Sequence, residues 1–265
     1  MPTPASRLLS AVTSFGPSAI AFSGGVDSAL VAAAFLRAKI PVLAIHISLP
    51  LQPASEASRV PALASQLNLP FKQIRFPLSK LPFLKHNPPD RCYLCKKTLL
   101  AAIQSTAKKH GFLTLCDGTH ASDLSDHRPG LRAVAEFNVR SPLLDAQLTK
   151  PEILHLARLW RIPFAGRVSS ACLATRIPTN FPVTQKKLAA IESAEDALHS
   201  LGFTNFRVRH HDTIARIELP PKQFPRALKF RDQILAALFP HFRFITLDLA
   251  GYKTGNMNVE KTPHS

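Results

Sequence analysis

The sequence predicts an α/β fold, a doubly wound parallel sheet followed by a small C-terminal α+β domain. Strand-like and helix-like apolar segments alternate through the first two-thirds of the chain, as a parallel sheet with crossover helices requires. At 265 residues, with 46% hydrophobic and 19% charged side chains, the chain can bury one large core and one small one. The pattern changes near residue 180. We therefore expect a large domain over residues 1–180 and a small one over residues 181–265.

The large domain is expected to contain alternating strands and helices. An apolar run over residues 18–22 predicts the first strand. Thr149 and Glu152 have capping-box spacing, which predicts a helix that begins there. The Pro-rich segment 78–90 predicts a loop that delivers Cys92 and Cys95. The expected strands are residues 18–22, 41–48, 71–76 and 112–116, and the expected helices are residues 29–39, 56–67, 96–110 and 150–160.

The small domain has a different pattern. Apolar residues recur at helical spacing from Leu188 to Leu201, which predicts a helix that ends at Gly202. Two alternating segments follow, so we expect a mixed or antiparallel sheet. Its expected strands are residues 206–211, 213–219 and 242–249, with a helix near residues 225–238.

The composition indicates the cellular compartment of the protein. The chain has no run of about 18 apolar residues, so we expect no membrane span. Its N-terminus lacks the apolar region of a signal peptide. Four cysteines are few for a secreted disulfide scaffold of this size. We therefore expect a cytoplasmic protein.

The charge calls for an anionic partner. The chain has 33 Lys and Arg against 17 Asp and Glu, a formal net charge of +16. Nucleic acid is the first candidate for such a chain. However, the basic residues are scattered, aromatic interleaving is thin, and there is no basic tail. We expect no nucleic-acid partner, and ATP with a phosphorylated small substrate accounts for only part of the excess charge.

The segment AFSGGVDS, residues 21–28, is the strongest chemical motif. A strand, a Gly-Gly turn and a helix would aim backbone N–H groups and the helix N-terminus at an anion. No Lys follows the glycines, so this is not the loop that holds a phosphate for γ-transfer. The pattern resembles the pyrophosphate loop of enzymes that cleave ATP between its α and β phosphates. The residues expected to bind the pyrophosphate portion are Ser23, Gly24, Gly25, Asp27 and Ser28, with Asp27 also a ligand for Mg²⁺.

A second group of polar residues follows the expected fourth strand. Asp117 comes directly after that strand, where open α/β sheets place ligand-binding groups. Asp123, Asp126 and Arg128 come next, and they are either solvated loop charges or ligand contacts. Of these, Arg128 is our candidate for ATP or substrate binding.

Three cysteines form the other informative constellation. Cys92-Tyr-Leu-Cys95 and the distant Cys172 fit three interpretations: a structural zinc site with His86 as a fourth ligand, a redox dithiol, or an iron–sulfur cluster. With three thiolates a [4Fe–4S] cluster would keep one iron open. Cys116 lies in an apolar strand-like segment, where we expect a buried, inert thiol.

Together these motifs resemble one enzyme family. The chain is similar to the ATP-dependent sulfur transferases that make the pyridinium-3,5-bisthiocarboxylic acid mononucleotide nickel cofactor of lactate racemase. The fold that this implies is of the pyrophosphate-loop type, like that of the adenine nucleotide alpha hydrolases. The matching segments run through almost the whole chain: AFSGGVDS, NPPDRCYLCK, DGTHASDLSDHRPGLRA, SPLLDAQLTKPEI, ACLATRIP, FRVRHHDTIARIE and LDLAGYKTGNMN.

The resemblance implies a reaction and its cofactors. ATP would adenylate a carboxylate of pyridinium-3,5-biscarboxylic acid mononucleotide, releasing pyrophosphate, and sulfur would then displace AMP to leave a thiocarboxylate. In some members the cysteine aligned with Cys172 donates its own sulfur and becomes dehydroalanine. Other members have cysteines at the positions of Cys92 and Cys95 as well, and the three hold a [4Fe–4S] cluster that carries a transferable sulfide. This chain has all three, so we expect the cluster type, with ATP, Mg²⁺ and a sulfide source required, and a homo-oligomer.

Two departures and several arginines qualify this picture. The family commonly has DGTN where this chain has His120, and a Pro-containing segment where it has Val168-Ser-Ser. Arg176 follows Cys172 by four residues and either assists a thiolate or the leaving phosphate, or pairs with a surface carboxylate. Arg207 and Arg209 share one strand face and could hold a phosphate. Arg216, Glu218 and Glu195 are weaker candidates for the substrate or a subunit interface.

Two rival functions remain open. A tRNA thiolase of the same superfamily would also combine a pyrophosphate loop with Cys-x-x-Cys, and the basic charge favours it. A non-catalytic nucleotide-binding or RNA-binding protein is the other rival, but mere binding gives no reason for the three cysteines.

Overall fold

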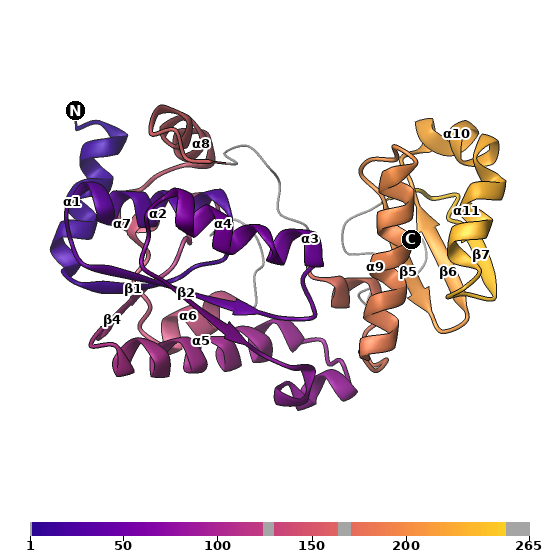
Figure 1. The fold of residues 1–265 in the computed structure, drawn as a ribbon, viewed down its shortest axis with the longest axis horizontal. Helices are drawn as coiled ribbons and strands as arrows, with labels where there is room; N and C mark the ends of the chain where they lie inside the picture. The colour runs from indigo at the N-terminus through magenta and orange to yellow at the C-terminus, as the bar shows by residue number, and fades with distance from the viewer. Residues whose placement is uncertain (1, 124–129, 164–170, 253–265) are drawn as a thin grey trace, which may run out of the picture. The chain divides into compact units, whose positions relative to one another are not determined.

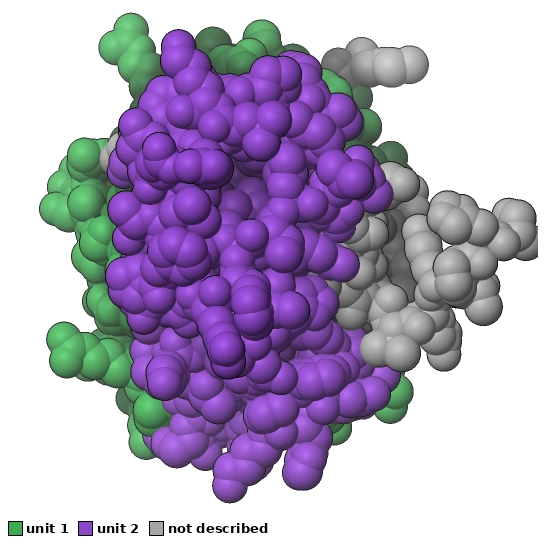
Figure 2. Space-filling view, turned by 90° about the vertical axis from the view of Figure 1, so that its right-hand side faces the viewer, with its two compact units in different colours: residues 1–49, 54–77, 92–170 green, residues 50–53, 78–91, 171–265 purple. Residues whose placement is uncertain are grey.

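The computed structural model describes residues 2–123, 130–163 and 171–252 (Figure 1). Within them the chain divides into two compact units, which Figure 2 shows in different colours. Each unit combines three separate segments of the chain, so the predicted domain boundary at residue 180 stays a prediction. Unit 1 comprises Met1–Leu49, Ala54–Pro77 and Cys92–Ser170, and unit 2 comprises Pro50–Pro53, Leu78–Arg91 and Ala171–Ser265.

Unit 1 is built on a four-stranded parallel sheet in the order β3-β2-β1-β4. In the register of the sheet, Ser18 lies opposite Val42 on one side and Thr114 on the other. The strands are β1 (Ser18–Ala21), β2 (Val42–Ser48), β3 (Phe71–Arg75) and β4 (Thr114–Cys116). The longer helices are α1 (Pro4–Phe15), α2 (Val26–Arg37), α4 (Arg59–Gln66), α5 (Arg91–Lys109) and α8 (Lys150–Leu159), and the short ones are α3 (Ala54–Ala57), η3 (Ala121–Asp123), α6 (Gly130–Glu136) and α7 (Pro142–Asp145).

Helices cover both faces of this sheet. The crossover helices α2 and α4 lie on one face, while α5 and α6 lie on the other (Figure 1). α2 is apolar along most of its length, and its residues from Ser28 to Phe35 are all buried. It contacts α1 and α8, which complete the core on that face. A parallel sheet buried on both faces is the arrangement that the alternating sequence predicted.

Three local differences correct the sequence-based expectations. α1 was not predicted, because Pro4 and Thr3 give only a short N-terminal cap signal. The helix expected over residues 56–67 is two helices separated at Ser58. The segment 78–90 contains two short 3-10 turns and no α-helix or strand, as expected. The start predicted for the next helix at residue 96 is wrong, because α5 already begins at Arg91 and contains Cys92 and Cys95. No Pro or Gly interrupts the chain between Arg91 and the end of the helix, so the helix extends back to the Pro-rich segment.

Unit 2 contains a three-stranded mixed sheet in the order β5-β6-β7. β5 and β6 are antiparallel, β6 and β7 are parallel, and α9 contacts β5 and α11. Leu198, Phe203 and Val208 are completely buried in its apolar core. The elements are η1 (Leu78–Lys80), η2 (Pro82–Lys85), η4 (Leu173–Arg176), α9 (Gln185–Ser200), β5 (Arg207–His211), β6 (Ile214–Glu218), η5 (Pro221–Gln223), α10 (Phe224–Lys229), α11 (Arg231–Leu238) and β7 (Phe244–Leu247).

Among the helices of the described ranges, none is long and apolar enough to cross a membrane.

Candidate functional site

A cavity of about 470 Å³ lies at the carboxyl ends of β1 and β4. The chain passes from β1 outward to β2 and β3 and then returns to place β4 on the other side of β1. Such a reversal leaves a crevice outside the strand ends, where open α/β sheets bind ligands. The cavity is lined by Ala21, Ser23, Asp27, Ser28, Lys96, Asp117, Gly118, Thr119, His120, Ser122, Asp123 and Lys150.

The loop after β1 is held in a tight turn by its own side chains. Ser23 Oγ accepts from the Gly25 amide at 3.2 Å and lies 3.1 Å from Ser28 Oγ, which donates to the Gly25 carbonyl. Gly24 has φ +80°, and a Cβ there would lie 2.7 Å from Val60 Cγ2, so glycine is required. Gly25 is the N-cap of the twelve-residue α2, whose N-terminus therefore opens at the cavity.

The loop after β4 approaches α2 closely. A Cβ at Gly118 would lie 2.9 Å from the Ser28 amide nitrogen, so no side chain fits there. Asp117 is buried and accepts from Thr119 N, Thr119 Oγ1 and Ser141 Oγ at 2.8–3.0 Å. Lys96 Nζ lies 3.7 Å from the same carboxylate. Asp117 therefore organises the turn and orients Lys96.

Asp27 is the most exposed of the three carboxylates that line the cavity. It accepts from Lys150 Nζ at 2.5 Å, and His120 Nε2 lies 3.9 Å from the same oxygen. His120 is buried, and its backbone amide donates to Asp123 at 3.1 Å. The imidazole thus lies in the cavity wall between the carboxylates of Asp27 and Asp123, with Nδ1 3.6 Å from Asp123 Oδ2.

Cys92 and Cys95 lie in the first turns of α5, three residues apart and so on one face of the helix. Cys92 is exposed and Cys95 is half-buried. Cys172, in unit 2, is exposed and immediately precedes η4. Among residues 2–123, 130–163 and 171–252, no group of three or more His, Cys, Asp and Glu side chains is arranged to hold a metal ion, and the cluster stays a prediction.

The prediction for Cys116 is confirmed. The thiol is completely buried, and burial raises its pKa to about 12. At neutral pH it is therefore a protonated core residue.

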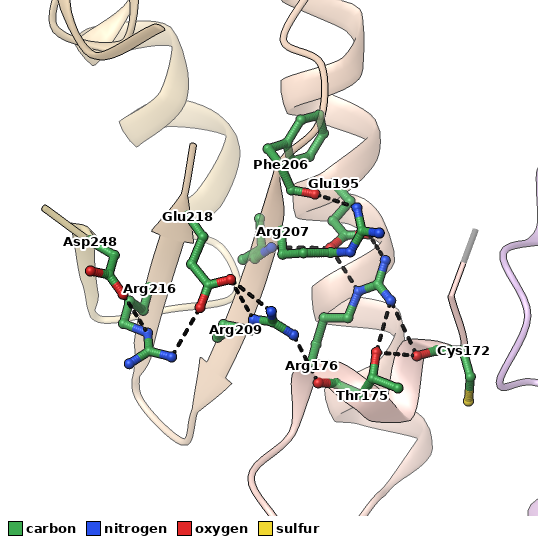
Figure 3. Close-up of polar contacts among 11 residues, drawn as sticks. Cys172, Thr175, Arg176, Glu195, Phe206, Arg207, Arg209, Arg216, Glu218 and Asp248 are labelled. Carbon is green, nitrogen blue, oxygen red and sulfur yellow. Dashed lines mark hydrogen bonds and ion pairs between the residues drawn. The ribbon is translucent and has the colours of Figure 1, made fainter. Parts of the chain in front are cut away.

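A cluster of arginines and carboxylates occupies unit 2 (Figure 3). Arg176 is only 1% exposed and forms a two-point ion pair with Glu195, with both N···O distances 2.9 Å. Arg209 is also buried and donates twice to Glu218, which accepts from Arg216 as well. The carboxylate partner expected for Arg176 is thus present, but Glu195 is mostly covered, with 14% of its side chain exposed, rather than fully on the surface.

Arg207 differs from its neighbours in the cluster. Its Nη1 donates to the Phe206 carbonyl at 2.6 Å, and its guanidinium lies 5.1 Å from the centre of the Tyr252 ring. Burial, and then the charge of Arg176, lower its pKa. Within the part of the chain that the structure describes, it forms no ion pair with a carboxylate. Arg207 is therefore the guanidinium of the cluster with the strongest need for an anion. Arg128 and Val168 lie outside the described residues.

No family model matches the chain. An uncharacterised protein of Synechocystis sp. is 35% identical over 246 residues, which cover 90% of this chain and 91% of that protein. The pyridinium-3,5-bisthiocarboxylic acid mononucleotide synthase of Lactiplantibacillus plantarum is 34% identical over 242 residues, 90% of this chain and 88% of the synthase. The chain belongs to the family of this synthase. An uncharacterised protein of Methanocaldococcus jannaschii is 34% identical over 200 residues, 76% of each chain.

Membership of the synthase family confirms the resemblance at the level of the family. It leaves the three-cysteine type, and the role of each site residue, as predictions. The structure adds two cavity residues that the sequence analysis did not select, Lys96 and Lys150. Both belong to segments that match the family, NPPDRCYLCK and SPLLDAQLTKPEI, and both lie near the start of a helix. A lysine at that position in a matching segment could have been selected from the sequence as a candidate for the site.

Proposed function

We propose that this protein is an ATP-dependent sulfur transferase that converts a carboxylate of pyridinium-3,5-biscarboxylic acid mononucleotide into a thiocarboxylate. The observation that carries the proposal is a cavity at the switch point of the sheet, lined by the SGGVDS loop, in a chain that is 34% identical to a named synthase over 90% of its length. The synthase name gives the product class. The cavity gives a place for the nucleotide that activates the carboxylate.

The loop and the two lysines support ATP binding of the pyrophosphate-loop type. The N-terminus of α2 carries partial positive charge, and Lys96 and Lys150 add two full charges around the same cavity. In the first step a substrate carboxylate oxygen attacks the α-phosphorus and the bond to the β-phosphate oxygen breaks, so pyrophosphate leaves with the electron pair. These cations stabilise the negative charge that moves onto pyrophosphate.

Asp27 fits the role of a Mg²⁺ ligand. It is a partly exposed carboxylate inside the cavity, and carboxylate oxygen is the donor that Mg²⁺ prefers. Because Lys150 now holds this carboxylate, Lys150 would turn to the phosphates when Asp27 binds the ion. Mg²⁺ there would neutralise phosphate charge.

The second step needs a sulfur nucleophile. Attack on the acyl carbon of the adenylate forms the C–S bond and breaks the C–O bond, so AMP leaves. Cys172 is exposed, which suits a thiol that must reach an acyl carbon. Cys92 and Cys95 offer two thiols on one helix face, which fits part of a ligand set completed by Cys172. A [4Fe–4S] cluster held by these three would supply an open iron for a transferable sulfide.

The substrate phosphate is proposed to bind Arg207. That guanidinium lies among Arg176 and Arg209, which already hold Glu195 and Glu218, and is the one that an anion would complete. Arg209 remains a candidate for the edge of the same site, and Arg176 would contribute only its positive charge beside Arg207. Following the family resemblance, we further propose a cytoplasmic homo-oligomer that receives sulfide from a separate donor.

One experiment tests the function. The protein is purified anaerobically, its iron content and visible spectrum are recorded, and AMP release from ATP is measured with the pyridinium biscarboxylate mononucleotide or with tRNA. We expect AMP and thiocarboxylate with the mononucleotide. AMP formed only with tRNA would identify a tRNA thiolase instead.

The same preparation separates the two sulfur sources. If a cluster delivers the sulfur, Cys92→Ser and Cys95→Ser lose repeated turnover. If Cys172 is consumed, an active, colourless protein loses the mass of H₂S from that residue after one turnover.

A further inference from the structure

The short turn that carries Cys172 is tied down by buried side chains of unit 2. η4 (Leu173–Arg176) follows the cysteine directly, and a turn of four residues has little stability of its own. Three backbone hydrogen bonds support the turn: Leu173 N donates to the Leu51 carbonyl at 2.9 Å, Thr175 N to the Cys172 carbonyl at 2.9 Å and Ile177 N to the Ala174 carbonyl at 3.2 Å. Two arginine side chains add further ties on either side of the cysteine and at the end of the turn.

Arg176 supplies the first tie (Figure 3). Its Nη1 donates to the carbonyls of Ala171 at 2.7 Å and Cys172 at 3.2 Å. The guanidinium therefore holds the two carbonyl groups that precede and follow the Cα of Cys172. Its Nε and Nη2 donate to the two oxygens of Glu195 on α9. Glu195 Oε1 also accepts from the Val208 amide of β5, at 3.1 Å. The turn is thereby connected to a helix and a strand of the core.

Arg209 supplies the second tie. Its Nη1 donates to the Thr175 carbonyl at 3.0 Å, while its Nε and Nη2 donate to Glu218 on β6. Glu218 is completely buried and also accepts from Arg216. Two buried arginines, each paired with a glutamate, thus contact the turn at both ends.

These contacts describe a role that differs from ligand binding. Every nitrogen of the Arg176 guanidinium has a protein partner, and 1% exposure leaves it almost no surface for a substrate. Charge-assisted, two-point pairs of arginine and carboxylate also fix geometry better than a single lysine contact can.

The geometry points to Arg176, locked by Glu195, as a positioning residue that fixes the backbone conformation of Cys172 for the sulfur-transfer step. The inference rests on the proposed sulfur transfer. Misplacement of a reacting group by an ångström can slow a reaction about 100-fold, so the loss of this tie acts on the transfer step. The ATP-binding residues belong to unit 1, so apparent ATP affinity is expected to be unchanged.

The test compares Arg176→Lys with Arg226→Lys, a matched change in the same unit. Arg226 also donates to a backbone carbonyl, that of Leu201 at 2.7 Å, but has no contact with the cluster. In Arg176→Lys we expect single-turnover thiocarboxylate formation to slow at least tenfold with the KM for ATP within twofold of wild type. Hydrogen exchange is expected to rise in the peptide over residues 172–177 and to stay unchanged in the β5–β6 ladder. Arg226→Lys should match wild type in all three measurements.

Three results would overturn the inference: unchanged transfer in Arg176→Lys, unchanged exchange over residues 172–177, or faster exchange throughout unit 2, which would mark a general folding role. Exchange requires no substrate. An inactive wild-type protein would therefore refute the proposed function while the exchange measurement still decides whether Arg176 holds the turn.

Discussion

The cavity of unit 1 and the arginine cluster of unit 2 use the same kinds of charged side chain in opposite ways. In the cavity, Asp27 and Lys150 pair while 28% and 38% exposed, and both face open space. In the cluster, Arg209 and Glu218 pair while 6% and 0% exposed. A partly solvated pair is worth little and can exchange partners, whereas a buried pair cannot lose one member without leaving an unpaired charge. The first arrangement suits a ligand site and the second suits a scaffold.

The largest expected effect separates the two chemical steps. Cys172→Ser removes the proposed cluster ligand or sulfur donor and changes no residue that lines the cavity. Thiocarboxylate formation should fall by about 1000-fold or more, because a serine hydroxyl replaces neither a thiolate ligand of iron nor a sulfur to be transferred. Adenylation should persist, measured as substrate-dependent exchange of labelled pyrophosphate into ATP. Loss of this exchange in the variant would mean that adenylation also depends on Cys172.

The next effect probes the buried cluster. Arg209→Met removes both hydrogen bonds that Arg209 donates to the buried Glu218, and such a break costs about 3–5 kcal/mol of unfolding free energy. We expect the loss in urea unfolding followed by hydrogen exchange in β5 and β6. Trp160, the single tryptophan of the chain, belongs to unit 1, and its fluorescence serves as the internal reference. A cost below about 1 kcal/mol would place this pair in the same class as a surface pair.

Substitution of a cavity lysine is expected to change stability little and to weaken ATP binding clearly. Lys150→Met removes one charge-assisted contact with phosphate, which is worth about 1.5–3 kcal/mol, so the KM for ATP should rise at least tenfold. The free energy of unfolding should change by less than about 1 kcal/mol, because the pair with Asp27 is partly exposed. The matched control is Lys187→Met, since Lys187 pairs with the exposed Asp212 away from the cavity. An equal rise in KM in both variants would contradict a phosphate role for Lys150.

The smallest expected effect is a pH dependence of stability. Burial lowers the pKa of His46 in unit 1, and of His210 and His211 in unit 2, below the ordinary value of 6.5. The unfolded chain therefore binds protons first as the pH falls through 6.5, and stability decreases below that pH. With two such residues in unit 2, urea midpoints at pH 7.5 and 5.5 should differ more for unit 2 than for unit 1. A midpoint that rises on acidification would contradict the prediction.

Much of the fold could be predicted because its signals are local. β1, β2 and the capping box at Thr149 follow from apolar runs and short-range spacing, and all appear where expected. The start of α5 was missed because prolines at 88 and 89 indicate where a helix cannot continue, but not how soon the next one begins.

The site was harder to predict because its residues are joined by tertiary contacts. The loop from Ser23 to Ser28 is contiguous, so its place at the cavity follows from one motif. Lys150 lies 123 residues from its partner Asp27, and only the strand order brings them together. The alternation of Arg207 and Arg209 predicted that they share a strand face. It could not show that Arg209 is already paired with Glu218.

Helix α5 gives the cavity and the paired thiols a common mechanical support. Lys96, which lines the cavity, is the residue next to Cys95, and both lie in the first turns of a continuous helix of 19 residues. A helix of this length moves as a rod, because each of its turns is bonded to the next. A shift of the α5 backbone at Lys96 would therefore move Cys92 and Cys95 with it, so the proposed nucleotide site and the thiol pair are coupled through one helix.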